Sequence, residues 1–251
     1  MPPDIDEVAS WIRNARSVVA LTGAGISTES GIPDFRGPNG VWTKDPKAER
    51  LSDIRYYVSD PEVRALAWQG RLNHPAWTAA PSAGHTALVD LERKGKLDLL
   101  VTQNIDGLHQ LAGTDPERLV EIHGTIREVE CLSCGERAPM ERALERVRAG
   151  ETDPPCRSCG GILKSATVSF GQSLDADHLR RSHAAAGACD VFLAVGTSLT
   201  VYPVAALPEV ALAGGARLVI VNQGQTPYDG VAHALFGGRI GEIMPKLALL
   251  V

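Results

Sequence analysis

Four of the five cysteines in this chain of 251 residues form two CxxC pairs, Cys131 with Cys134 and Cys156 with Cys159. Each pair can place two thiolates on one metal ion, and four thiolates complete a tetrahedral zinc shell with no open position. The 21 residues between the pairs slightly exceed the commonest zinc-ribbon spacing of about 15–20. The pattern predicts one structural zinc ion that holds residues 126–163 together, because this segment has few apolar residues. Free or redox-active thiols are the alternative.

His123 is the histidine whose position favours a chemical role. It follows the short apolar run 119–122 and so stands at the end of an expected strand. An imidazole titrates near neutral pH, so His123 can act as a general base if it faces a bound ligand. The alternative is a structural histidine, the more common role for a single histidine.

A glycine-rich segment, GAGISTESGIPDFRG at 23–37, follows the apolar run 18–21. Gly23 and Gly25 leave room for a backbone to approach a pyrophosphate, and amides at a helix N-terminus donate to phosphate oxygens. Thr28 stands where the usual dinucleotide fingerprint has its third glycine, so a simple strand-to-helix turn remains open. Polar groups crowd the same stretch and predict a loop that closes over a ligand, namely Ser27, Glu29, Ser30, Asp34 and Arg36.

Polar or small residues directly follow three other apolar runs. The run 97–101 leads into Gln103, Asn104 and Asp106, the run 191–195 into Gly196, Thr197 and Ser198, and the run 218–221 into Asn222, Gln223 and Gly224. In open parallel sheets, ligands bind beyond the carboxyl ends of the strands, so these turns are candidates for one shared site. For the turn 102–107 the alternative is that Asn and Asp simply form the turn.

Positioning these groups requires buried strands that alternate with helices. The spacing of apolar residues predicts helices over 4–16, 82–95, 175–187, 203–212 and 241–250. The recurring strand followed by a turn is typical of an α/β fold with a Rossmann-like doubly wound parallel sheet. We expect the aromatic-rich stretch 41–80 to form a helical insertion with a small core, and 163–171 to form an edge strand able to pair with a peptide. Cys189, at the start of an apolar run, is expected to be a buried structural thiol.

The composition limits the possible classes. Hydrophobic residues make up 44% of the chain, which is enough for a full core, and 25 basic residues against 30 acidic ones leave a net charge of −5. A negative net charge does not indicate sequence-independent binding to nucleic acid. The N-terminal residues show no secretory or transit signal, and no window holds 18 uninterrupted apolar residues. We therefore expect a soluble, cytoplasmic protein whose paired cysteines bind metal rather than form disulfides.

Together these motifs resemble those of the sirtuin family of NAD-dependent protein lysine deacylases, of the bacterial type. The matching stretches are the segment 23–37, TQNIDGLH at 102–109, HG at 123–124, the CxxC pairs, VSFG at 168–171, VGTSLTVYP at 195–203 and VN at 221–222. The resemblance implies a Rossmann-like NAD-binding large domain of residues 1–40, 81–125 and 164–251. It also implies a small domain made of the helical insertion 41–80 and a zinc ribbon at 126–163.

The resemblance implies a role for each matching position. His123 would be the general base, Asn104 a second catalytic residue, and Val168, Phe170 and Gly171 would border the acyl-lysine. NAD would be held by Gly23, Ala24, Gly25, Ser27, Asp34, Phe35, Arg36, Gln103, Asn104, Ile105, Asp106, Gly196, Thr197, Ser198, Asn222, Gln223 and Gly224, with Ile240 near the adenine.

The implied reaction removes an acetyl group from lysine and releases nicotinamide, free lysine and O-acetyl-ADP-ribose. The acyl oxygen is a poor nucleophile, so the site must hold it in line and exclude water. Two positions depart from the family pattern. Gln172 stands where many members have an acidic residue, and Trp68-x-x-Arg71 stands where succinyl- and malonyl-specific members carry Tyr-x-x-Arg. We therefore expect neutral acyl groups, with desuccinylation or demalonylation as the alternative.

Other functions remain open from the sequence. Mono-ADP-ribosyl transfer to protein shares the cleavage of nicotinamide and differs in the acceptor. A binding module that only senses NAD is another alternative, disfavoured by the acidic charge and by the joint presence of Asn104 and His123. The altered glycine fingerprint disfavours an NAD-linked dehydrogenase. We expect acyl-lysine proteins or peptides as partners, no contact with membrane or nucleic acid, and a monomer.

Overall fold

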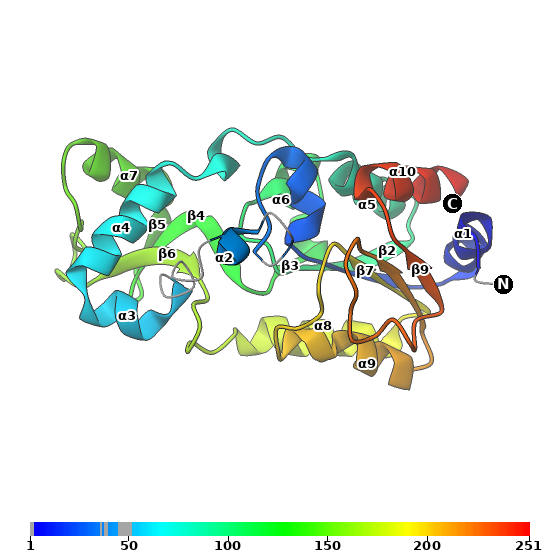
Figure 1. Cartoon of the computed structure of the whole chain (residues 1–251). Coiled ribbons are helices and arrows are strands. Elements are labelled where there is room, and N and C mark those ends of the chain that lie inside the picture. Colours follow the sequence, from blue (N-terminus) through cyan, green and yellow to red (C-terminus); the bar gives the residue numbers. More distant parts are fainter. Residues whose placement is uncertain (1–2, 36, 38–39, 45–51) are drawn as a thin grey trace.

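The computed structural model describes residues 3–35, 37, 40–44 and 52–251. It contains one six-stranded and one three-stranded sheet, which lie at opposite ends of an elongated molecule (Figure 1). Arg36, expected in the cofactor loop, lies outside the described residues. No helix within the described ranges is long and apolar enough to cross a membrane.

The larger sheet is parallel throughout and follows the order β3-β2-β1-β7-β8-β9. This is the Rossmann order, which reverses between β1 and β7, the position where such sheets bind ligands. Strand β9 was not predicted from the sequence, because three residues are too few for a periodic signal. The strands are β1 (Val18–Thr22), β2 (Leu97–Thr102), β3 (Leu119–Glu121), β7 (Val191–Val195), β8 (Arg217–Val221) and β9 (Ala234–Phe236).

Helices cover both faces of this sheet, which makes the central strands fully buried (Figure 1). On one face lie α1 (Ile5–Asn14), α5 (Ala83–Arg93) and α10 (Ile240–Leu250), and on the other α8 (Ala176–Ala188) and α9 (Leu207–Ala213). Asp4 caps α1, since its carboxylate accepts from the amide of Glu7 at 2.9 Å. These helices confirm the ones that were predicted from the spacing of apolar residues. Shorter helical turns are η1 (Ala24–Ser30), η3 (Pro75–Trp77), α6 (Leu108–Ala112), η4 (Pro116–Arg118) and η5 (Val204–Ala206).

The smaller sheet is antiparallel and has the order β5-β4-β6, formed by β4 (Gly124–Cys131), β5 (Arg137–Pro139) and β6 (Leu163–Thr167). It packs with α7 (Met140–Arg148) and, through Tyr57 and Trp68, with α3 (Ile54–Ser59) and α4 (Pro61–Leu72) of the insertion. The insertion also contains the short helix α2 (Val41–Lys44). Trp68 of α4 is fully buried beside Met140, Leu144 and Val147 of α7. The segment 126–163 therefore contributes more apolar side chains than we expected, and it shares one core with the insertion.

The strand predicted over 163–171 is shorter in the structure. It ends at Thr167, and Phe170 instead pairs with the insertion, donating its amide to Ser52 and accepting from the amide of Ile54. This backbone pairing uses the Phe170 groups that we had expected to be open to a peptide. Because β6 pairs with β4, residues 164–167 lie in the smaller sheet.

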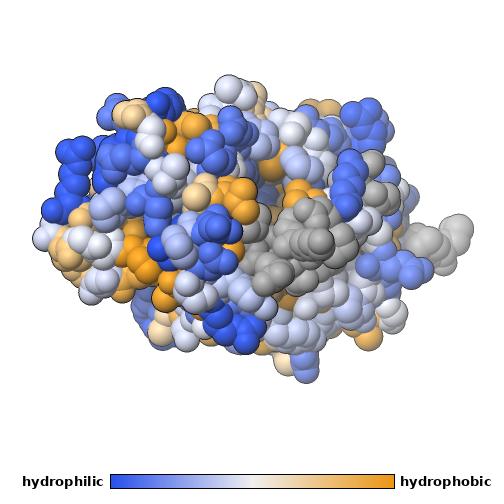
Figure 2. Space-filling view, turned by 60° about the vertical axis from the view of Figure 1, so that its left-hand side comes forward, coloured by the Kyte–Doolittle hydropathy of each residue, from blue (hydrophilic) through white to orange (hydrophobic). Residues whose placement is uncertain are grey.

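Figure 2 brings the end with the smaller sheet forward. Its surface is mixed, with apolar patches separated by polar and charged side chains (Figure 2). Exposed apolar side chains of the insertion include Val58 and Leu66. Tyr57 and Trp68, in contrast, are buried, which agrees with the small aromatic core predicted for residues 41–80.

Candidate active site

The glycine segment meets the loop after β7 through direct backbone contact. Gly23 donates to the carbonyl of Val195 at 3.1 Å, and Gly25 donates to that of Gly196 at 2.9 Å. A Cβ on Gly23 or Gly25 would lie 2.8 Å from an atom of Gly196, which itself has a φ of +64°. These glycines are therefore required by the close approach of two loops, in addition to the space for phosphate that the sequence suggested.

Three buried polar side chains link the glycine segment to the turn after β2. The Asn104 amide donates to the carbonyl of Gly23 and to the Ser27 hydroxyl, both at 3.1 Å. Ser27 donates to one Asp106 carboxylate oxygen at 2.8 Å, and the other accepts from the amide of Leu108 at 2.9 Å. Asn104 and Asp106 therefore do more than form their own turn, because they connect segments about 80 residues apart along the chain.

His123 is held in one tautomer by the same turn. Its Nδ1 lies 3.0 Å from the carbonyl oxygen of Gln103, which can only accept, so Nδ1 carries the proton. The Nε2 atom keeps its lone pair. Burial lowers the pKa of His123, opposed by the hydrogen bond to Gln103. At neutral pH the imidazole is therefore uncharged and able to accept a proton.

Gln103 links His123 to the third loop. Its side-chain amide donates to the Thr197 hydroxyl at 2.9 Å, and Thr197 accepts from the amide of Leu199 at 3.2 Å. The Ser198 hydroxyl lies 2.9 Å from that of Thr200. The loops that follow β1, β2, β3 and β7 thus converge beyond the carboxyl ends of the parallel strands, as predicted.

The remaining residues expected to bind the cofactor make local contacts or are exposed, with one exception. Asn222 donates to the carbonyl of Gly224 at 2.8 Å, and both Gln223 and Gly224 are exposed. Asp34 accepts from the amide of Gly37 at 2.9 Å, and Phe35 is exposed. Ile240, by contrast, is buried in the core at the start of α10, where its Cγ2 lies 2.7 Å from the position of a Cβ on Gly84.

Two buried histidines that the sequence analysis did not single out lie behind the polar cluster. His85 accepts at Nδ1 from the amide of Ser82 at 3.1 Å, and its Nε2 lies 3.5 Å from the Ser27 hydroxyl. His109 contacts Thr22 at 2.9 Å, and the two imidazole rings are 4.6 Å apart. Burial lowers the pKa of His85 to about 4 and that of His109 well below its usual value. His109 closes the matching stretch 102–109, but neither histidine follows an apolar run, so the sequence assigns neither a chemical role.

We expect acid to destabilise the protein through His85. Between its folded pKa of about 4 and an unfolded pKa near 6.5, the unfolded chain binds more protons, so stability is complete above pH 6.5 and is lost as pH falls. At pH 5 the loss from this group is about 2 kcal/mol. Urea unfolding at pH 7 and pH 5 should show a smaller difference in His85→Asn than in wild type. An equal difference in the two proteins would contradict the assignment, and His183→Asn on α8 is the matched control.

The residues expected to border the acyl-lysine begin next to His123, because a backbone hydrogen bond joins the two stretches. Val168 donates its amide to the carbonyl of His123 at 2.8 Å. Gly171 has a φ of +87°, and the Gln172 side chain accepts from the amide of Ser169 at 3.0 Å. Gln172 therefore closes the turn around Phe170, which is a local role for the residue that departs from the family pattern.

Arg71 of α4 is engaged inside the small-sheet end of the molecule. Its guanidinium donates to the Tyr57 hydroxyl at 3.0 Å and to Ser165 at 3.3 Å. It also stacks over the rings of Tyr57 and Trp68, at 5.0 and 4.7 Å from their centroids. Tyr57 in turn donates to the carbonyl of Leu163 at 2.7 Å. The guanidinium thus joins the insertion to β6.

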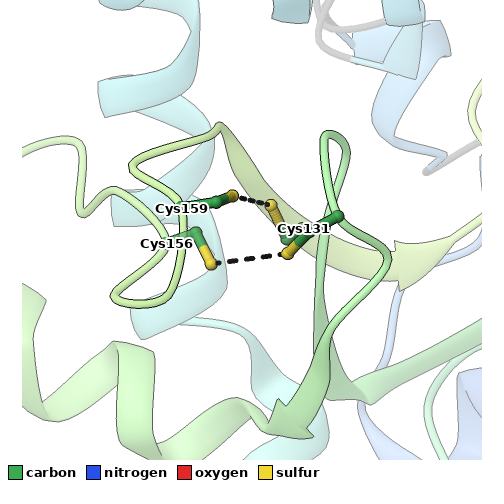
Figure 3. Close-up of side chains that lie close together, drawn as sticks. Cys131, Cys156 and Cys159 are labelled. Carbon is green, nitrogen blue, oxygen red and sulfur yellow. Dashed lines mark hydrogen bonds between the residues drawn. The ribbon is translucent and has the colours of Figure 1, made fainter.

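The four paired cysteines converge from two similar turns (Figure 3). In each turn a glycine with a φ of +73°, Gly135 or Gly160, donates its amide to the carbonyl of the first cysteine at 2.9 Å. The sulfurs all lie within 4.8 Å of one another, with Cys131 to Cys159 at 3.5 Å and Cys134 to Cys156 at 3.9 Å. Zinc–sulfur bonds of about 2.3 Å in a tetrahedron separate sulfurs by about 3.8 Å, so the four thiols fit a zinc ion.

Cys189 lies apart from these four and is buried, as predicted. Burial raises the pKa of its thiol to about 11. Its sulfur donates to the carbonyl of Ala186 at 3.2 Å. This thiol therefore remains protonated and has a packing role.

Comparison with known proteins gives consistent matches over most of the chain. The model of the Sir2 family matches residues 23–203. The NAD-dependent protein deacetylase 2 of Streptomyces coelicolor is 52% identical over 92% of this chain and 95% of its own length. The NAD-dependent protein deacetylase 1 of Pyrobaculum aerophilum is 43% identical over 97% of this chain and 93% of its own. A solved Sir2 structure with a deacetylated peptide and acetyl-ADP-ribose has a TM-score of 0.90 at 34% identity, covering 98% of this chain and 97% of that one.

Proposed function

Because this chain belongs to the Sir2 family, we propose that the loops around His123 form the catalytic centre of a protein deacetylase. The chain is an NAD-dependent enzyme that removes acetyl groups from protein lysine and releases nicotinamide and O-acetyl-ADP-ribose. The observation that supports His123 as general base is its fixed tautomer. Because Nδ1 donates to Gln103, Nε2 can accept a proton from a substrate hydroxyl.

The residues that would hold NAD are those of the converging loops. Gly23, Gly25 and Gly196 let two of these loops pack backbone against backbone, because a Cβ at any of the three would collide with the facing loop. NAD would supply the ribose carbon that the acyl oxygen attacks as nicotinamide leaves, and the ribose hydroxyl that carries the acyl group in the product. The buried Asp106 carboxylate and Asn104 amide are already oriented by Ser27, so little reorganisation accompanies binding.

The substrate in this proposal is an acyl-lysine peptide that passes Val168, Phe170 and Gly171. Support comes from the hydrogen bond between Val168 and the carbonyl of His123, which keeps these residues beside the base. A water-poor site is needed because the acyl oxygen is a weak nucleophile. The backbone pairing of Phe170 with Ser52 and Ile54 gives this stretch a fixed conformation.

We divide the chain into a large NAD-binding domain and a small domain, as the family resemblance implies. The large domain comprises residues 1–40, 81–125 and the C-terminal part, and the small domain the insertion 41–80 and the zinc ribbon from 126. The pairing of β6 with β4 favours a ribbon boundary after Thr167 rather than at 163. One zinc ion held by the four paired cysteines would stabilise the ribbon.

The test is NAD-dependent release of nicotinamide from a panel of acyl-lysine peptides. We expect release with acetyl-lysine, no release with the unmodified peptide, and O-acetyl-ADP-ribose as the product by mass spectrometry. An ADP-ribosyl adduct on the protein would instead identify a transferase. An absence of release with every peptide would favour a module that only binds NAD.

The same panel tests the acyl preference, which rests on Arg71. Its guanidinium already donates to Tyr57 and Ser165 and lies over two aromatic rings, so turning it toward a succinyl carboxylate would disturb these contacts. We expect kcat/KM for acetyl-lysine to exceed that for succinyl-lysine by about tenfold or more, since this corresponds to about 1.4 kcal/mol. A strong preference for succinyl-lysine would overturn the prediction.

A further inference from the structure

Arg127 connects three segments that meet at the catalytic centre. It lies on β4, where the chain leaves the larger sheet for the smaller one. Its guanidinium donates twice to the backbone carbonyl of Asp106, from Nε at 3.2 Å and from Nη2 at 2.9 Å. Nη2 also donates to the carbonyl of Ala76 at 3.0 Å, and the guanidinium lies 5.2 Å from the ring centroid of Trp77. One side chain thus joins the ribbon, the turn after β2 and the insertion.

The turn after β2 is shaped to receive this guanidinium. Gly107 has a φ of +74°, and a Cβ at that position would lie 2.8 Å from Nε of Arg127. The neighbouring residue on β4, Ile126, donates its amide to the carbonyl of Ile105 at 2.9 Å. Asp106 is consequently fixed at both ends, at its carboxylate by Ser27 and Leu108 and at its carbonyl by Arg127.

A salt bridge does not account for this arrangement. Arg127 has no carboxylate partner among the ion pairs of the described residues, and its donors go to backbone carbonyls. Hydrogen bonds from a charged group are stronger than neutral ones, and a fork that reaches two carbonyls also fixes direction. A lysine in its place would offer a single nitrogen and could not reproduce the fork.

We propose that Arg127 is a positioning residue that sets the affinity of the site for the nicotinamide end of NAD. It acts through Asp106 and the turn 103–107 and does not itself contact the reactants. The inference rests on the proposed function, in which this turn helps to hold NAD. We assign the turn to the nicotinamide end because the carbonyl of Gln103 holds His123, and the base acts on the ribose that nicotinamide leaves. The inference adds that the position of the turn depends on a contact with the ribbon and the insertion, so that these two segments take part in cofactor recognition.

The experiment compares Arg127→Met and Arg127→Lys with wild type. Initial rates with an acetyl-lysine peptide give KM for NAD, KM for the peptide and the inhibition constant of nicotinamide, and zinc content and melting temperature are measured on the same samples. For Arg127→Met we expect KM for NAD and the inhibition constant of nicotinamide each to rise about tenfold, since several charged hydrogen bonds are lost. KM for the peptide should stay within about twofold, and Arg127→Lys should lie between Met and wild type.

The matched control is Arg137→Met on β5, an exposed arginine of the same sheet that pairs with Glu128 and Glu130. It should leave all three constants unchanged. Arg127→Met with constants like wild type would overturn the inference, as would a lower melting temperature with no change in nicotinamide inhibition. If Arg127→Met does not fold, the same constants measured on Arg127→Lys test the inference. Wild-type enzyme that releases no nicotinamide would refute the proposed function instead, so the two failures are distinguishable.

Discussion

Replacement of His123 by alanine should abolish deacetylation while leaving NAD binding nearly intact. The side chain supplies the neutral Nε2 base, and general base catalysis contributes about 10²–10⁴-fold to a rate. The side chain contributes little to stability, because it is half-buried and makes one hydrogen bond, to Gln103. Steady-state rates with an acetyl-lysine peptide measure the first effect, and calorimetric titration with NAD measures the second.

A related histidine variant separates loss of the base from general damage. His183→Ala on α8 replaces another half-buried histidine and should keep wild-type turnover. His123→Ala with near wild-type turnover would refute the assignment of the general base. Because burial lowers the pKa of His123, wild-type kcat/KM should be flat above pH 6.5 and should fall as the imidazole becomes protonated at lower pH.

Removal of zinc should unfold the ribbon and the insertion together. Structural zinc contributes about 10–16 kcal/mol of apparent binding free energy in small zinc-finger peptides, which exceeds what a small apolar core supplies. Trp68 shares that core with Leu144 and Val147, so both segments lose it when the cysteine turns come apart. Chelation, or Cys131→Ser, should therefore reduce zinc from one ion per chain to none and change tryptophan fluorescence and far-UV circular dichroism.

The fifth cysteine provides the control for this experiment. Cys189→Ala removes a buried thiol outside the four paired cysteines and should retain zinc. Metal-free protein with an unchanged melting profile would contradict the structural role of the ion. Activity should be lost together with the metal, because β4 begins beside His123 and β6 ends beside it.

The sheet was predictable because β1, β2, β7 and β8 are mostly apolar, with Asp98 and Arg217 as exceptions, and each is followed by a turn of small or polar residues. Helix α7 was overlooked, although Met140, Ala143, Leu144 and Val147 have helical spacing, because charged residues dominate the segment. The end of β6 at Thr167 could not be predicted, since it depends on the pairing of Phe170 with the distant residues 52–54.

The candidate site was likewise predictable in part. Its loops could be located from the sequence, because polar residues directly follow buried strands. The contacts that orient them could not, since Ser27 to Asp106 and Arg127 to the carbonyl of Asp106 join distant parts of the chain. His85 and His109 were missed for the same reason, because only the fold places these imidazoles side by side.

The core around Trp68 has a consequence for biosynthesis. Helix α4 ends at Leu72 and β6 begins at Leu163, so the ribosome completes the helix about 90 residues before the last strand of its partner sheet. At about 5–20 residues per second, this interval lasts about 5–20 s. Until α7 and then β6 have been translated, the indole lacks part of the ribbon core that covers it, and the nascent helix is a site for chaperone binding.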